Sequence, residues 1–167
     1  MSSPLNALQL ETTGKVADAD EWVRLSSQSL EQCCQESLME RINVTSINEI
    51  HQHDRFAVLS HTLDEIFCYF NRAALETFEQ SEPDVYQLHS KYSAPDFVRE
   101  KRAQVVQQAV VDDLQVFSTA VRITAQSQRI FVLQNVLLWN VYDESGERLG
   151  QTALYDRESI LPYEDES

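Results

Sequence analysis

The segment Arg129–Tyr142 constrains the fold of this chain more than any other feature of the sequence. It is a long run rich in β-branched and aromatic side chains, which favour extended strands. Simple alternation predicts Ile130, Val132, Val136 and Leu138 on one face, and Phe131, Leu133, Leu137 and Trp139 on the other. A strand that is apolar on both faces has to be covered on both sides. We therefore expect a sheet with a packed layer on each face.

Four other segments have the composition of strands and are separated by polar turns. They are Phe56–Ser60, Glu65–Phe70, Gln115–Thr124 and Arg148–Tyr155. The last of these follows the long strand after the short turn Asp143–Gly146, which is hairpin spacing. The sequence thus predicts one antiparallel sheet of five strands.

Helical patterns lie between the second and third strands and before the first. Asn71 is placed to cap a helix over Arg72–Phe78, and a second helix is expected over Asp96–Val110, with Ser93 as its cap. Apolar residues from Trp22 to Ile42 recur at steps of three and four, which predicts one amphipathic helix capped by Asp18 or Asp20. The internal helices would cover one face of the sheet. The N-terminal helix, a dimer partner or both would cover the other, which makes the fold class α+β.

This order of elements is that of a PAS-like domain, and several segments resemble the MEKHLA domain family. They include Ile66–Leu75, Leu88–Ala94, Leu138–Asn140 and Gly150–Ala153. The chain departs from the family pattern at Ala120, at His89 and in the turn Gln126–Gln128, where the family tends to have glycine or proline. The resemblance implies a PAS-like five-stranded antiparallel sheet with helices on one face and an additional N-terminal helix. It also implies a sensory or dimer-regulating role, without a ligand or cofactor that can be transferred.

The chain length of 167 residues is typical of one domain. Its expected parts are a flexible leader over 1–17, the N-terminal amphipathic helix over 18–44, a PAS-like MEKHLA-type domain over 52–156 and an acidic tail over 157–167.

The net charge of −14, from 13 basic and 27 acidic residues, would repel phosphate backbones and anionic lipids. Direct binding to nucleic acid is therefore not expected. Membrane insertion is not expected either, because no apolar run approaches the roughly 20 residues that a spanning helix needs. Cys33, Cys34 and Cys68 form no Cys-x-x-Cys pair, which favours buried, reduced thiols in a cytoplasmic protein.

The sequence contains no recognisable catalytic or metal-binding set, and we do not expect an enzyme. His51, His53 and Asp54 lack a further ligand at suitable spacing and are more typical of a solvated loop. The cysteine of flavin-binding PAS photoreceptors is absent between Asn71 and Val110, and the helix Asp96–Val110 has no histidine for haem. The cofactor is unknown.

A pocket for a small ligand, with a few polar groups among apolar ones, is the remaining expectation. The candidate ligand-binding residues are Asn71, Arg122, Asn135, Trp139 and Gln151. Each has a structural alternative: a helix cap for Asn71, a salt bridge for Arg122, core packing for Trp139, and internal hydrogen bonds for Asn135 and Gln151.

Two functions remain open. The first is a sensory or regulatory module that binds a small ligand or a protein partner and forms a homodimer. The second is a non-catalytic acidic adaptor without a ligand, as a subunit of a larger assembly. A core filled by Phe67, Phe131 and Trp139 would favour the adaptor, since it would leave no room for a ligand.

Overall fold

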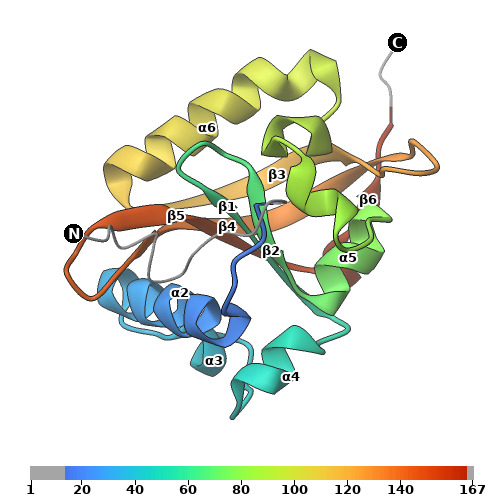
Figure 1. Cartoon of the computed structure of the whole chain (residues 1–167). Coiled ribbons are helices and arrows are strands. Elements are labelled where there is room, and N and C mark those ends of the chain that lie inside the picture. Colours follow the sequence, from blue (N-terminus) through green and yellow to red (C-terminus); the bar gives the residue numbers. More distant parts are fainter. Residues whose placement is uncertain (1–13, 165–167) are drawn as a thin grey trace.

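The computed structural model describes residues 14–164, and its centre is one antiparallel sheet (Figure 1). Its strands are β1 (Phe56–Thr62), β2 (Phe67–Phe70), β3 (Leu114–Ile123), β4 (Ile130–Tyr142) and β5 (Arg148–Asp156). The spatial order is β2-β1-β5-β4-β3, and a short sixth strand, β6 (Leu161–Pro162), pairs with β4. The predicted five-stranded antiparallel sheet is confirmed.

One face of the sheet is covered by the helices that lie between β2 and β3. They are α5 (Arg72–Phe78), three short 3-10 turns (Asp84–Gln87, Ser90–Ser93 and Asp96–Val98) and α6 (Arg99–Asp112). The prediction for the start of α6 was wrong in detail. The Ser93 hydroxyl donates to the Ser90 carbonyl (2.7 Å), so it caps nothing, and Pro95 begins a 3-10 turn that precedes α6.

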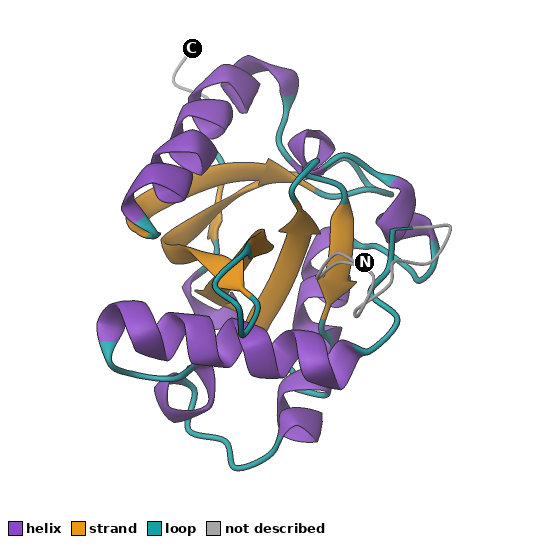
Figure 2. Ribbon diagram, turned by 60° about the vertical axis from the view of Figure 1, so that its left-hand side comes forward, coloured by secondary structure: helices purple, strands orange, loops and turns teal. Residues whose placement is uncertain are grey.

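The opposite face is covered by an N-terminal layer of α2 (Ala19–Cys34), α3 (Leu38–Arg41) and α4 (Ile47–His51) (Figures 1 and 2). Asp18 caps α2 as predicted, but the single helix from Trp22 to Ile42 was wrong. Gln35 adopts a left-handed conformation (φ 65°) and its N–H bonds the Glu31 carbonyl, which ends α2. Ser37 then starts α3 with a reciprocal capping box to Glu40.

The predicted faces of β4 were wrong beyond Asn135. This residue has a left-handed backbone (φ 53°), and the ladder between β3 and β4 omits the pair Ser118–Asn135 while keeping its register. Alternation is therefore reversed after Asn135. Phe131, Leu133 and Val136 pack together under the internal helices, whereas Leu137, Trp139 and Val141 pack against the N-terminal layer. Because of this reversal, β4 contributes bulky apolar side chains to the core on both faces of the sheet.

The expected leader over 1–17 lies largely outside the described residues, as do residues 165–167 of the expected tail. Val16 is buried, and its N–H donates to the Cys68 carbonyl (3.1 Å). The three cysteines are free thiols, and Cys33 is exposed rather than buried, because it lies on the outer side of α2. No helix within residues 14–164 has the length and apolar character to cross a membrane.

Candidate ligand cavity

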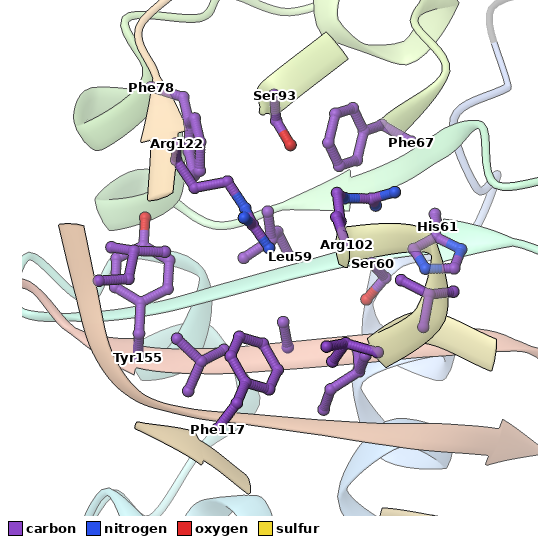
Figure 3. A pocket seen from close by; sticks show the side chains of 16 residues that line it. Leu59, Ser60, His61, Phe67, Phe78, Ser93, Arg102, Phe117, Arg122 and Tyr155 are labelled. Atoms are coloured by element: carbon purple, nitrogen blue, oxygen red, sulfur yellow. The ribbon is translucent and has the colours of Figure 1, made fainter. Parts of the chain in front are cut away.

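A cavity of about 60 Å³ lies between α6 and the sheet (Figure 3). Its apolar lining includes Leu59, Phe78, Val106, Phe117, Leu133 and Val136. A second cavity of about 80 Å³ adjoins it between α6 and β3, and Arg102, Val105, Phe117 and Arg122 line both. The sheet, α5 and α6 thus enclose an apolar space with two guanidinium groups in its wall.

Arg122 enters this space from β3, and its side chain has few partners. Its Nη1 donates to the neighbouring Val121 carbonyl (2.8 Å). Within residues 14–164, no acidic side chain forms an ion pair with Arg122. Burial lowers the pKa of Arg122 to about 9, and the charge of Arg102 acts in the same direction. The guanidinium stays protonated at neutral pH and has donors free to bind.

Arg102, from α6, is in contrast held by other protein groups. Its Nη2 donates to the Ser90 hydroxyl (2.7 Å), and its Nη1 lies 3.6 Å from the Glu65 carboxylate. The Arg102 side chain is 8% exposed and that of Glu65 is 36% exposed, so the guanidinium is shielded from water while the carboxylate is partly solvated. Burial lowers the pKa of Arg102, while Glu65 opposes that shift. Arg102 therefore has a counter-ion that Arg122 lacks.

Two neutral groups in the lining also have unused hydrogen-bonding capacity. His61 Nδ1 lies 3.0 Å from the Thr62 carbonyl, so it carries the proton, and its buried Nε2 is an acceptor. Burial lowers the pKa of His61 to about 4, which keeps the ring neutral at pH 7. Neither His61 Nε2 nor the buried Tyr155 hydroxyl has a hydrogen-bond partner in the part of the chain that the structure describes. Buried polar atoms without partners are uncommon and call for an explanation.

Gln151 does not line the cavity, but it neighbours the lining residues His61 and Val106. On β5 it pairs with His61 of β1, and its Nε2 donates to the Val106 carbonyl of α6 and to Asn140 Oδ1, both at 3.2 Å. Asn140 in turn donates to Asp113 Oδ1 (2.9 Å). These bonds fix α6 on the sheet. The Gln151 Oε1 atom, also buried, accepts no hydrogen bond from the described residues.

The other three sequence candidates lie away from this cavity. Asn71 caps α5: its Oδ1 accepts from the Ala74 and Val58 amides, and its Nδ2 donates to two backbone carbonyls. Trp139 packs on the opposite face of the sheet, and Asn135 is exposed at the reversal of β4. Asn71 is therefore a helix cap and Trp139 a core residue, which are the structural alternatives given for them above. Asn135 instead marks the point where the backbone of β4 reverses its alternation.

Sequence reasoning missed Arg102, His61 and Tyr155 as lining residues. For Arg102 a signal existed, because Arg102, Val106 and Ala109 have helical spacing and form the buried side of α6. For His61 and Tyr155 the placement depends on the pairing of β1 with β5, which no local pattern reveals. Within residues 14–164 no group of three or more His, Cys, Asp or Glu side chains could hold a metal ion.

A buried hydroxyl network connects the strands of the cavity to the N-terminal layer. Thr152 of β5 lies 2.7 Å from the Ser60 hydroxyl of β1 and 3.0 Å from the Ser26 hydroxyl of α2. Thr152 and Ser60 directly precede the lining residues Ala153 and His61 in the sequence. A shift of β1 or β5 around the cavity would therefore change the hydrogen bond that holds α2 on the sheet.

The strand order and the helices over one face define a PAS-like domain, and solved structures share this fold. A PAS domain from Colwellia psychrerythraea has a TM-score of 0.54 at 12% identity and covers 59% of this chain and 82% of its own. A PAS domain from a two-component sensor histidine kinase scores 0.51 at 18% identity (65% and 90% covered). The PAS domain, in complex with ethanol, of a LuxR-family transcriptional regulator from Burkholderia thailandensis scores 0.52 at 10% identity (69% and 99% covered).

The chain belongs to the MEKHLA domain family, whose model matches residues 20–159. This match includes the N-terminal helical layer. No curated protein matches the sequence.

Proposed function

We propose that this MEKHLA domain is a sensory module that binds a small molecule in the cavity between α6 and the sheet. The observation that carries the proposal is a set of polar side chains in the lining of an otherwise apolar cavity. Arg122, Tyr155 and His61 all line it (Figure 3), His61 Nε2 and the Tyr155 hydroxyl have no hydrogen-bond partner among residues 14–164, and Arg122 donates only to the Val121 carbonyl. A ligand that uses these atoms would remove the cost of burying them without partners.

The response to the ligand is proposed to reach the N-terminal layer through the sheet. Alpha-helix α2 is held there by three polar contacts: Ser26 with Thr152, the Trp139 indole with the Ser26 carbonyl, and the Tyr142 amide with the Ser29 hydroxyl (2.9 Å). We propose that α2 has two packed arrangements, which differ in how they fit against β5. A ligand in the cavity would shift the population from one arrangement to the other.

A homodimer or a protein partner is also part of the proposal. Since α2 of the same chain already covers Trp139 and Val141, a second copy is not needed to bury β4. The partner would instead contact the outer side of the N-terminal layer, where a change in α2 would alter its affinity. We propose a cytoplasmic, non-catalytic role for the module.

The acidic adaptor without a ligand is the alternative. Phe67, Phe131 and Trp139 were expected to fill the core in that case, but a cavity remains beside Phe67. This cavity favours the sensory module.

Transmission can be tested without knowledge of the ligand by filling the cavity. In Ala153→Leu the added methylenes point from β5 into the cavity, and in the control Ala125→Leu the same groups are added at an exposed turn. Amide hydrogen exchange of residues 19–34 is measured in both variants and in the wild type. We expect a change in α2 for Ala153→Leu alone. Unchanged exchange in α2, together with altered exchange in α6, would contradict transmission through the sheet.

A further inference from the structure

The charges around the two adjoining cavities differ in sign from the rest of the protein. Lys101, Arg102 and Arg122 line them, and no described Asp or Glu does. This is unexpected in a chain with 27 acidic and 13 basic residues. The carboxylate of Glu65 lies near Arg102 and is already paired with it. The cavities are thus a cationic site within an anionic protein, which selects for anions.

We infer that the ligand is a small monocarboxylate with an apolar body, whose carboxylate pairs with Arg122. The inference rests on the proposed function, because it names the chemical class that the same cavity binds. The planar guanidinium presents two parallel N–H donors that match the two oxygens of a carboxylate. Arg102 is engaged by Ser90 and by the counter-ion Glu65, so Arg122, which lacks an acidic partner, is the more open anion-binding group.

Tyr155 completes the recognition of the carboxylate. It is 2% exposed and lines the same cavity as Arg122, and burial raises the pKa of its hydroxyl, so it is protonated at neutral pH. The Tyr155 hydroxyl has no hydrogen-bond partner among residues 14–164, so its O–H is free to donate to an oxyanion.

The remaining lining determines the body of the ligand. Phe78, Phe117, Leu133 and Val136 offer it only hydrocarbon surface. A cavity of about 60 Å³ holds about four to six atoms the size of water, and the adjoining cavity extends this space. Short aliphatic and small aromatic acids, such as butyrate and benzoate, have the required size and shape. Dicarboxylates would place a second charge against hydrocarbon, which is costly.

Isothermal titration calorimetry with sodium butyrate and sodium benzoate tests the inference, with butyramide and benzamide as uncharged probes of the same shape. We expect each acid to bind the wild type at least about tenfold more tightly than its amide, which corresponds to one charge-assisted pair. Arg122→Met should lose about tenfold or more in affinity for the acids and keep its affinity for the amides. The control is Arg129→Met, which removes an exposed arginine near the same strands. It should behave as the wild type.

Folding of the variants is checked by urea unfolding, and Arg122→Met should be as stable as the wild type or more so, since a partly buried cation without an acidic partner is removed. Equal binding of acids and amides, unchanged acid binding in Arg122→Met, or no acid binding to the wild type would each overturn the inference. Amide binding that Ala153→Leu abolishes would leave the proposed cavity function standing. If instead Ala153→Leu binds every probe as the wild type does, the proposed function fails as well.

Discussion

The indole nitrogen of Trp139 donates a 2.8 Å hydrogen bond to the backbone carbonyl of Ser26. This contact joins the long strand β4 to the middle of α2, on the face of the sheet opposite the cavity. Both residues are buried. The N-terminal layer is thereby part of the core of the domain, and the family match, which starts at residue 20, includes it.

Trp139→Phe should lower the free energy of unfolding by about 1–2 kcal/mol, because it removes a buried hydrogen bond and leaves a small void. Trp22→Phe is a matched control, since Trp22 is equally buried but its indole nitrogen has no partner among residues 14–164. It should cost less. Urea denaturation of the three proteins makes the comparison, and a larger loss for Trp22→Phe would show that the Trp139–Ser26 bond contributes little.

Asn71→Ala should lower the free energy of unfolding by about 3 kcal/mol or more. The change removes the cap of α5 and leaves the Val58 amide and the Ile50 and Phe56 carbonyls without their partner. Asn48→Ala, at an exposed position of α4, should change it by no more than about 0.5 kcal/mol. Thermal unfolding of both variants measures the difference. Similar melting temperatures for the two variants would refute the role given to Asn71.

The stability of the protein should fall as the pH is lowered from 7 to 5, partly through His61. Because the folded-state pKa of His61 is about 4, below the unfolded value of roughly 6.5, the unfolded state binds the proton first. The loss from this residue should be about 2 kcal/mol at pH 5. This range lies above the ordinary pKa of carboxylates, so the carboxylates with lowered pKa, such as Asp156, contribute little there.

His61→Asn should therefore show a flatter dependence of unfolding free energy on pH than the wild type. His89→Asn is the control. The pKa of His89 is also lowered, but His89 is less buried than His61, so its removal should flatten the pH dependence less. Urea unfolding at pH 7, 6 and 5 gives the slopes. The assignment is refuted if His61→Asn keeps the full slope of the wild type.

Gly150→Ala should prevent stable folding or cost more than about 3 kcal/mol. A Cβ atom at this position would lie 2.1 Å from the His61 carbonyl oxygen of the paired strand β1, where only backbone movement could relieve the contact. Gly146→Ala is the comparison: its Cβ would meet no atom within 4 Å, and the φ of +87° alone costs about 1 kcal/mol. Circular dichroism melts rank the two. Equal stability would contradict the pairing of β1 and β5.

Local signals in the sequence predicted much of the fold. The Asn71 cap gave the helix Arg72–Phe78 its observed bounds, and the hydrophobic runs located all five main strands. Two of the failures occurred where a non-glycine residue adopts a left-handed backbone. Gln35 ends α2 and Asn135 reverses β4, and neither change leaves a pattern in hydrophobicity.

The site was less predictable than the fold, because its residues meet only after the sheet has formed. Arg122 was identified as an arginine in an apolar strand, and it does line the cavity. Trp139 was predicted on the same face as Phe131 and Leu133, but the reversal at Asn135 turns it to the opposite face, toward α2. Placing Trp139 away from the cavity requires the backbone geometry of β4, which the amino-acid composition of the strand does not reveal.

Native mass spectrometry of the purified protein, before and after incubation with a cell extract, tests the central claim that the cavity holds a small molecule. We expect a non-covalent adduct of small mass on the wild type and on Ala125→Leu, and its absence from Ala153→Leu. The same spectra give the subunit number. A wild type that retains no small molecule, or an Ala153→Leu variant that retains the same one, would contradict the presence of a ligand in the cavity.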